Sequence, residues 1–207
     1  MKITKNKYYS LTSEAFELNY LNSLSEQILS CRHLGFNQLS DSFAGTKGFS
    51  VIFKTSGISQ VKSNFPYFTP YLKSALKSNC NAFYLNPLIL EKGGRVEPHI
   101  DCSISGYSKS LTIAHIVSVL YVQVPSNLEG GELILSARGK QVGKITPETN
   151  TLLYFKGNLT HSVNQVQSKD IRISLVCEQY NLSENKLKKI PKFSLECNKN
   201  YETIECS

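Results

Sequence analysis

The sequence predicts a mainly β domain with flanking helices, and three observations support this prediction. From about residue 81 onward, short apolar or alternating runs are separated by turn residues, a texture typical of β-sandwiches and barrels. Before residue 79, two segments instead carry apolar side chains at helical spacing. The length of 207 residues fits one domain around one core. We therefore expect a single domain over residues 1–180, with helical support at about 11–78 and a strand-rich core at about 82–180.

The first helix is expected within residues 11–31. Its apolar side chains recur every four residues, which places them on one helix face, and they are Phe16, Tyr20, Leu24 and Ile28. A second helix is expected over Thr69–Ser78, because apolar side chains cluster on one side and Pro70 suits a first helical turn. Both helices are expected to support the sheet.

Eight strands are expected in the core, at 82–90, 96–101, 115–124, 131–136, 141–145, 151–155, 161–166 and 171–180. Residues that tolerate turn geometry separate them, among them Gly93-Gly94, Gly130-Gly131 and Lys156-Gly157-Asn158. From residue 181 the chain is rich in Lys, Asn and Glu, with sparse apolar residues. This composition predicts a C-terminal tail over 181–207 that is wrapped on the surface or partly mobile.

Cysteine usage and hydropathy predict a protein of a reducing compartment. The six cysteines have neither C-x-x-C spacing nor the density of a disulfide scaffold, so free thiols are expected. No run approaches the roughly 18 apolar residues of a membrane span, and the start MKITKNKYYS has no apolar signal region. We therefore expect a cytoplasmic protein with no membrane association.

The formal net charge of +7 suits an anionic partner, but the lysines are scattered along the chain. Nucleic-acid binding would favour a clustered basic stripe with exposed aromatic side chains. An anionic co-substrate or general solubility explains the charge at least as well. Nucleic acid is therefore not the expected partner.

Three residues form a candidate metal site. His99 and Asp101 lie two positions apart in an expected strand, so their side chains share a face, with Ile100 directed to the opposite one. His161 lies far along the chain and is expected on a facing strand. Two histidines and one carboxylate form the facial triad of non-haem iron(II) enzymes, which leaves metal positions open for a chelating co-substrate and oxygen.

An arginine on a later strand is a candidate anion ligand. In the segment IRISLVCEQY, Arg172, Ser174 and Val176 share one face of the expected strand, and the alternate residues share the other. A guanidinium can donate two parallel hydrogen bonds to one carboxylate. We therefore expect Arg172 to bind a carboxylate, with Ser174 as a further donor.

The order His99-x-Asp101, His161, Arg172-x-Ser174, with Gly130-Gly131-Glu132-Leu133 between the first two elements, resembles the iron(II)/2-oxoglutarate-dependent oxygenases, in their prolyl-hydroxylase-like branch. The resemblance covers roughly residues 82–180. It implies a double-stranded β-helix, the jelly roll of cupin-like proteins. It also implies the cofactors Fe(II), 2-oxoglutarate and O2, with ascorbate as a supporting reductant. In this chemistry 2-oxoglutarate is decarboxylated to succinate while an aliphatic C–H bond is hydroxylated.

The resemblance also implies roles for individual residues. Tyr121 matches a tyrosine whose hydroxyl contacts the far carboxylate of the co-substrate, and Leu133 matches an apolar contact on the same wall. The branch often has a tyrosine where this chain has Leu90, and Tyr84 or Asn86 is expected to take its place. The presence of a carboxylate in the triad argues against the related halogenases, which lack it.

Other residues near these motifs have ordinary interpretations. His115 opens an apolar strand without a spaced partner, so a structural role is expected. Glu97 shares the face of His99 and either orients a ligand or is an exposed carboxylate at a strand end. Cys102 adjoins the triad and is expected to point away from it.

The expected substrate is a prolyl or other amino-acid residue in a peptide, or a free amino acid. Two other functions stay open: a cupin-like metal-binding sensor without turnover, and demethylation of a nucleic-acid base, which would need an aromatic platform for a flipped base. Arg172 and Ser174 favour the oxygenase, because a sensor has no need of a carboxylate clamp. Segment 32–65 and loop 102–114 are expected to select the substrate, and the loop is expected to close over it.

Overall fold

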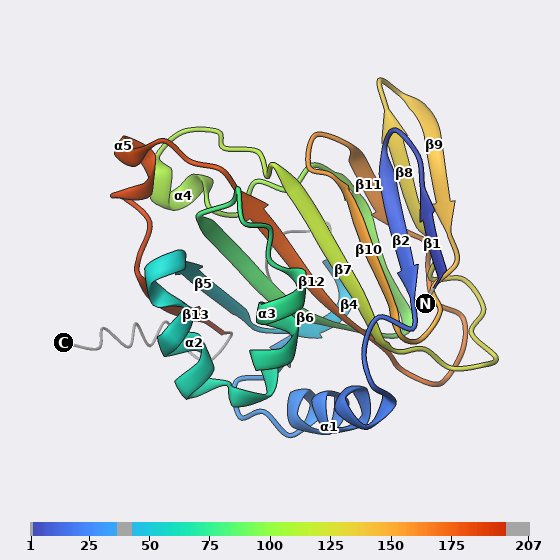
Figure 1. Cartoon of the computed structure of the whole chain (residues 1–207). Helices are drawn as coiled ribbons and strands as arrows, with labels where there is room; N and C mark the ends of the chain where they lie inside the picture. The colour runs from blue at the N-terminus through green and yellow to red at the C-terminus, as the bar shows by residue number, and fades with distance from the viewer. Residues whose placement is uncertain (1, 37–42, 198–207) are drawn as a thin grey trace.

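The computed structural model describes residues 2–36 and 43–197, and within them the fold is a curled antiparallel sheet, one face of which is covered by helices (Figure 1). The α-helices are α1 (Leu18–Leu29), α2 (Ile58–Asn64), α3 (Thr69–Ala75), α4 (Ser105–Ser108) and α5 (Glu184–Leu187), and the 3-10 turns are η1 (Thr55–Gly57) and η2 (Pro66–Phe68). The strands are β1 (Lys2–Lys5), β2 (Tyr9–Ser13), β3 (Gly35–Phe36), β4 (Phe43–Gly48), β5 (Ser50–Lys54), β6 (Ala82–His99), β7 (Ile116–Gln123), β8 (Leu133–Ala137), β9 (Lys140–Ile145), β10 (Thr151–Lys156), β11 (Thr160–Val163), β12 (Arg172–Tyr180) and β13 (Phe193–Glu196).

The central path of the sheet runs β1-β2-β10-β7-β12-β6-β11-β8-β9. Strand β6 connects its two halves. Its first half pairs with β12 and β5, its second half pairs with β11, and β4 pairs with residues of both halves. Because β6 carries His99 at its end, the strand that organises the sheet also positions the candidate metal site.

Two apolar clusters lie on the two faces of the sheet. One joins α1, α2 and α3 to the outer face, with Leu24, Phe68 and Leu175 fully buried in it. The other fills the inside of the curled sheet, with Leu90, Tyr121 and Leu135 fully buried. The alternation along β12 explains the division, since Ile173, Leu175 and Cys177 face the helices. The helical layer thus supports the wall from which the site projects.

The first helix begins later than its spacing predicts. It starts at Leu18, and residues 9–13 instead form β2, which pairs with β10. Tyr9 and Leu11 alternate with polar residues and pack against the inner cluster, so the strand buries them on one side. The predicted helix face survives in part, because Leu24 and Ile28 are buried.

The region predicted as helical support, residues 11–78, also contains strands. Val51, Ile52 and Phe53 are fully buried in β5, which pairs with both β6 and β13. A short run that is apolar on both faces suits a covered strand better than an amphipathic helix. Residues 37–42 of the segment expected to select substrate lie outside the described part of the chain.

The sequence predicted that Gly93-Gly94 separates two strands. This prediction is wrong, because β6 is continuous through both glycines. A Cβ on Gly94 would lie 2.8 Å from the carbonyl oxygen of Gly45 on β4. Gly93 adopts a φ of +87°, which favours glycine. These glycines therefore permit a close approach of two strands rather than a turn.

The expected tail is partly built into the sheet. Strand β13 extends the edge beside β5, and Leu182, Ile190 and Leu195 are buried. The rest of that segment, residues 198–207, lies outside the described residues. No helix in the described residues has the length and apolar character needed to cross a membrane. The five cysteines of the described chain are all free thiols.

Candidate active site

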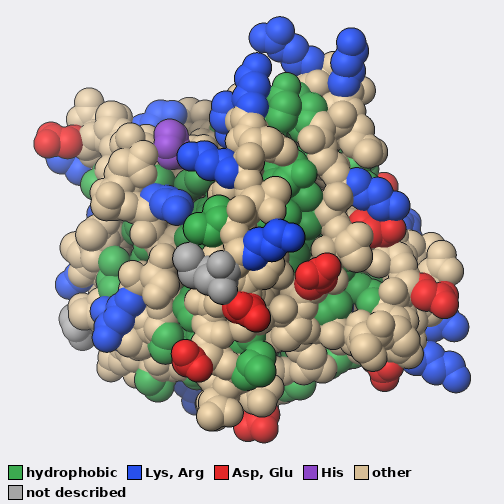
Figure 2. Space-filling model, turned by 45° about the vertical axis from the view of Figure 1, so that its right-hand side comes forward, with side chains coloured by type: hydrophobic (Ala, Val, Ile, Leu, Met, Phe, Trp, Pro, Cys, Tyr) green, Lys and Arg blue, Asp and Glu red, His purple; other side chains and the backbone are tan. Residues whose placement is uncertain are grey.

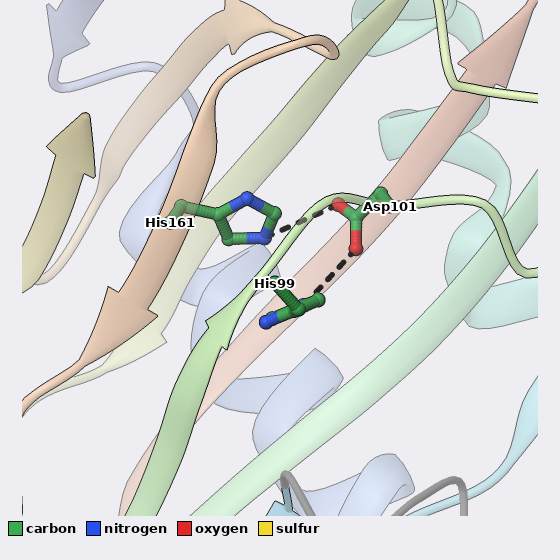
Figure 3. Close-up of side chains that lie close together, drawn as sticks. All are labelled: His99, Asp101 and His161. Carbon is green, nitrogen blue, oxygen red and sulfur yellow. Dashed lines mark ion pairs between the residues drawn. The ribbon is translucent and has the colours of Figure 1, made fainter. Parts of the chain in front are cut away.

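Strand pairing brings the three candidate metal ligands together. His99 ends β6, and His161 on β11 is its direct register partner. Asp101 follows two residues after His99, and the three side chains converge (Figure 3). His99 Nε2 lies 3.2 Å from Asp101 Oδ1, and His161 Nε2 lies 3.4 Å from Asp101 Oδ2. One ligand atom from each residue falls within 4.8 Å of the others, which is compatible with a single bound ion.

Backbone carbonyls orient both imidazoles. His99 Nδ1 lies 2.8 Å from the carbonyl oxygen of Glu97, and His161 Nδ1 lies 3.2 Å from that of Leu159. A carbonyl only accepts, so each Nδ1 donates, and each Nε2 is the ring atom turned toward Asp101. Two imidazole nitrogens and one carboxylate therefore converge on one point, where a proton or a metal ion can be shared. This donor set fits iron(II).

The electrostatics of the site agree with this picture. Burial alone would raise the pKa of Asp101, but contacts with His161 and His99 hold it well below its usual range. Burial is the largest single influence on the pKa of His99 and acts to lower it, but the hydrogen bond and charge of Asp101, the Glu97 carbonyl and the charge of Glu178 together raise it. Asp101 therefore remains a carboxylate, the form in which it can bind a metal.

A cavity of about 450 Å³ opens beside the triad, within the range of small-molecule sites. Apolar side chains make up much of its wall, including Leu88, Val119, Leu133 and Val163. The rings of Phe43 and Phe155 lie against His99 and His161, with centroids 5.4 and 4.9 Å apart, respectively. The metal ligands are thus held in an apolar setting that strengthens their electrostatic interactions.

Arg172 lies at the wall of this cavity and is 2% exposed. Its Nη1 donates to the Gly131 carbonyl, and its Nε donates to Ser174 Oγ at 3.3 Å. A guanidinium has five N–H donors, so three are left without a partner in the described chain. No carboxylate among the described residues pairs with it. Burial lowers the pKa of Arg172, but an arginine stays charged in proteins, so this position favours an anionic ligand.

The Gly130-Gly131 turn explains how Arg172 is held. Both glycines adopt left-handed φ values, +75° and +72°. A Cβ on Gly130 would lie 1.9 Å from the Gln165 carbonyl oxygen. Only glycine fits this crossing, which directs the Gly131 carbonyl at the guanidinium.

The residues that the resemblance places in the co-substrate site differ in their access to the cavity. Tyr121 and Leu133 both line it. The Tyr121 hydroxyl is buried and has no hydrogen-bond partner among the residues that the structure describes, and its ring lies 5.0 Å from the Arg172 guanidinium carbon. Ser174 is fully buried, is not part of the lining and accepts a hydrogen bond from Arg172. Ser174 therefore orients the guanidinium in this structure.

Several neighbouring residues differ from their predicted positions. Cys102 lines the cavity instead of pointing away, because β6 ends at His99 and strand alternation stops there. For the same reason Ile100 does not enter the opposite layer; it also lines the cavity and is 37% exposed. The Glu97 side chain pairs with Arg95 at 2.6 Å, so its backbone rather than its carboxylate orients His99.

Three further predictions concern the surroundings of the site. Tyr84 and Asn86 both line the cavity from β6, as expected for the strand that lacks the family's tyrosine. His115 lies within 3.2 Å of Asn79 and is not part of the cavity lining. In loop 102–114, Ile104 is fully buried and the Ser108 and Thr112 hydroxyls are 3.0 Å apart, so the loop is anchored in this structure.

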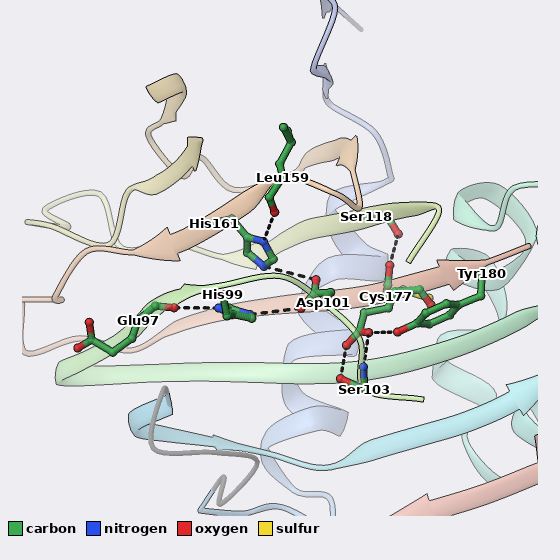
Figure 4. A network of polar contacts seen from close by, with 10 residues as sticks. Glu97, His99, Asp101, Ser103, Ser118, Leu159, His161, Cys177 and Tyr180 are labelled. Carbon is green, nitrogen blue, oxygen red and sulfur yellow. Dashed lines mark hydrogen bonds and ion pairs between the residues drawn. The ribbon is translucent and has the colours of Figure 1, made fainter. Parts of the chain in front are cut away.

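Sequence reasoning missed Glu178, which lines the cavity and is 4% exposed. It accepts hydrogen bonds from the Ser103 backbone N–H, the Ser103 hydroxyl and the Tyr180 hydroxyl. Figure 4 shows Ser103 and Tyr180 close to the triad. Burial and, secondly, the charge of Asp101 raise the pKa of Glu178 to about 8. A single Glu that breaks an apolar strand on the same face as Arg172 was the available signal.

On the face of the molecule in Figure 2, Lys and Arg side chains are spread out and interspersed with acidic ones. That view shows no continuous basic stripe of the kind that nucleic acid prefers. The scattered lysines of the sequence therefore remain scattered on this face.

Comparison with known proteins adds family information to this geometry. Residues 83–177 match the model of the 2OG-Fe(II) oxygenase superfamily. Among curated proteins, none matches the chain. Three solved structures illustrate the shared fold.

A prolyl-4-hydroxylase from Pseudomonas putida superposes with a TM-score of 0.58 at 15% identity, over 86% of this chain and 95% of that one. A prolyl hydroxylase from Trichoplax adhaerens, solved with a peptide fragment of the hypoxia inducible factor oxygen degradation domain, gives 0.58 at 15%, over 88% and 87%. HygX from Streptomyces hygroscopicus, solved with nickel and 2-oxoglutarate, gives 0.53 at 10%, over 82% of each chain. These likenesses confirm the double-stranded β-helix.

Proposed function

Since this chain is a 2-oxoglutarate- and iron(II)-dependent oxygenase, we propose that it hydroxylates an aliphatic C–H bond of a prolyl or other amino-acid residue in a peptide, or of a free amino acid. The observation that carries the proposal is the cavity itself. It has three converging metal ligands on one wall and, on another, a buried arginine with no carboxylate partner in the described chain.

His99, Asp101 and His161 are proposed to hold the iron. When bound, iron(II) supplies the activation of O2 that a protein side chain cannot provide. The residues contribute a facial arrangement, fixed by the two backbone carbonyls that orient the imidazoles. The rings of Phe43 and Phe155 lie against the two imidazoles and make that side of the centre apolar.

Arg172 is proposed to bind the far carboxylate of 2-oxoglutarate, with Tyr121 as a second donor and Leu133 as an apolar contact. The three free N–H groups of Arg172 and the unpartnered Tyr121 hydroxyl support this role. Ser174 is proposed to act indirectly on the co-substrate site. Its hydroxyl accepts a hydrogen bond from Arg172 Nε and so fixes the orientation of the guanidinium. A carboxylate bound there would compensate the buried charge.

The proposed substrate class is supported by the fold that the chain shares with the similar structures and by the residues of the site. Two of them are described as prolyl hydroxylases, and one of those contains a peptide. We further propose that the protein works in the cytoplasm, where free thiols are stable. Ascorbate is proposed to support turnover by keeping the iron reduced.

The direct experiment is to incubate the purified chain with Fe(II), ascorbate and 2-oxoglutarate and to measure succinate, with and without candidate substrates. Succinate formation that depends on 2-oxoglutarate is expected, and a substrate should increase it. If the metal-loaded protein binds iron but forms no succinate with any candidate, a metal-binding sensor would be the better description. The Tyr121→Phe variant should raise the KM for 2-oxoglutarate and leave the melting temperature unchanged, because the hydroxyl has no partner to lose.

A further inference from the structure

We propose that the substrate carries a positively charged nitrogen with N–H donors, and that Glu178, Glu196 and Asn86 bind it at the end of the cavity opposite Arg172. The inference rests on the proposed function and names the chemistry that selects its substrate. We call this region, formed by those three residues, the acidic end.

The sheet register separates the acidic end from Arg172. On β12, Arg172 pairs with Leu90 of β6, and Glu178 pairs with Tyr84. Six residues along a strand span about 20 Å at roughly 3.3 Å per residue. Both side chains line the same cavity because Arg172 and Glu178 lie six positions apart, and an even offset places two side chains on the same face of a strand. A cavity with a cation at one end can thus hold the anionic co-substrate there, which leaves the acidic end for the second molecule.

The carboxylates of the acidic end have only neutral donors. Glu178 accepts from Ser103 and Tyr180, and Glu196 accepts from the Tyr107 hydroxyl at 2.6 Å. No Lys or Arg within the described ranges forms an ion pair with either of them. Without a cation nearby, burial favours the protonated, neutral form of such a carboxyl group, whereas a cationic group with N–H donors would favour the carboxylate and bind to it.

Asn86 provides a second observation that points to a ligand. It is 6% exposed, lines the cavity and lies one pairing step from Glu178, opposite Val176. Its Nδ2 donates to Ser50 Oγ at 3.0 Å, so the amide is fixed and its Oδ1 has no donor in the described chain. An oxygen that only accepts, beside two carboxylates, favours a group that brings N–H donors and a positive charge.

A purely structural role for Glu178 would require only a hydrogen-bond acceptor at this position. Its hydrogen bonds from Ser103 hold the turn that follows Asp101. A neutral acceptor can make the same bonds. Glu178 differs from a neutral acceptor because it can give up its proton and pair, as a carboxylate, with a cation that arrives with the substrate.

The test measures binding to the full chain loaded with Mn²⁺ and 2-oxoglutarate, which requires no turnover. Two matched pairs of probes are titrated by calorimetry: N-acetyl-lysine methylamide against N-acetyl-norleucine methylamide, and proline methylamide against N-acetyl-proline methylamide. Broadening of probe NMR signals by Mn²⁺ shows that binding occurs near the metal. At least one cationic probe should bind about tenfold tighter than its neutral partner, the scale of a charge-assisted hydrogen bond. The lysine pair reports a basic side chain in a peptide, and the proline pair reports the amine of a free amino acid.

Variants distinguish charge from structure. Glu178→Gln should reduce the preference for the cationic probe to less than threefold, and Glu196→Gln should reduce it if the first variant does not fold. Glu97→Gln is the matched control, because that carboxylate pairs with Arg95 outside the cavity, and it should keep the preference. Ser103→Ala removes one donor to Glu178 and should also keep it.

Two results would overturn the inference: equal affinity for both members of each probe pair, or an unchanged preference in both Glu178→Gln and Glu196→Gln. Binding of 2-oxoglutarate to the wild-type Mn²⁺ protein is measured first. Its absence would refute the proposed function, and its presence with no cation preference would refute only the acidic end.

Discussion

Two glycines with the same backbone conformation offer a controlled test of how the arginine is held. Gly130 and Gly139 both have a φ of +75°. A Cβ on Gly139 meets nothing within 4 Å, whereas one on Gly130 would lie 1.9 Å from the Gln165 carbonyl oxygen. Alanine at either position incurs the left-handed backbone cost, about 1–2 kcal/mol, partly offset by a less flexible unfolded chain. Only Gly130→Ala adds a steric clash.

Gly139→Ala is therefore expected to reduce the free energy of unfolding by about 1 kcal/mol. Gly130→Ala should reduce it by a further 1–3 kcal/mol or so, the usual cost of overpacking. Because the neighbouring Gly131 carbonyl accepts from Arg172, Gly130→Ala should also weaken 2-oxoglutarate binding, and Gly139→Ala should not. Urea unfolding followed by circular dichroism and calorimetry with the Mn²⁺ protein measure the two effects. Equal losses of stability, with 2-oxoglutarate affinity unchanged in both variants, would refute this account of the turn.

The remaining predictions concern ligands and pH. Arg172→Ala should weaken 2-oxoglutarate binding by about 1.5–3 kcal/mol, since it removes a charge-assisted contact, and an unchanged calorimetric affinity would mean that the anion binds elsewhere. His99→Ala and Asp101→Ala should each abolish turnover and also abolish Mn²⁺ binding, which electron paramagnetic resonance measures. Retained Mn²⁺ binding in both variants would disprove the ligand assignment. Lys144 at 2.9 Å and Asn164 lower the pKa of Glu132 to about 2, against about 4.3 in an unfolded chain. The ion pair between Glu132 and Lys144 therefore stabilises the fold above a pH of about 4.3, and this stabilisation is lost as the pH falls toward 2. Glu132→Gln should thus cost at most about 1 kcal/mol at pH 7, and the difference from wild type in urea unfolding should shrink at pH 3; a difference that grows there would contradict the assignment.

Strand alternation allowed much of the site to be predicted. The two faces of β12 are as expected, with Arg172 and Val176 lining the cavity and Ile173 and Leu175 packed toward the helices. A strand has a period of two residues, so a polar residue on an apolar face is visible in the sequence. His161 was expected on a strand facing that of His99, and their direct pairing confirms this placement.

Features that depend on distant partners were not visible. Strand β2 forms because β10 pairs with it, and no local pattern in residues 9–13 names that partner. Glu178 lies near the end of its strand, where a carboxylate is usually exposed, and it is buried because the turn at Ser103 crosses it. The glycines at 93–94 were predicted as a turn because the close approach of β4 cannot be read from the sequence.

The central place of β6 affects how the site assembles during synthesis. Its partners extend from Phe43 on β4 to Tyr180 on β12, so its pairing is complete only when most of the chain has left the ribosome. A nascent chain that ends before β11 would already contain His99 and Asp101 but lack the third ligand. Long-range pairing of this kind forms late because distant segments must first meet. The time at which a refolding or newly made chain first binds metal with high affinity would therefore indicate when the pairing of the sheet is complete.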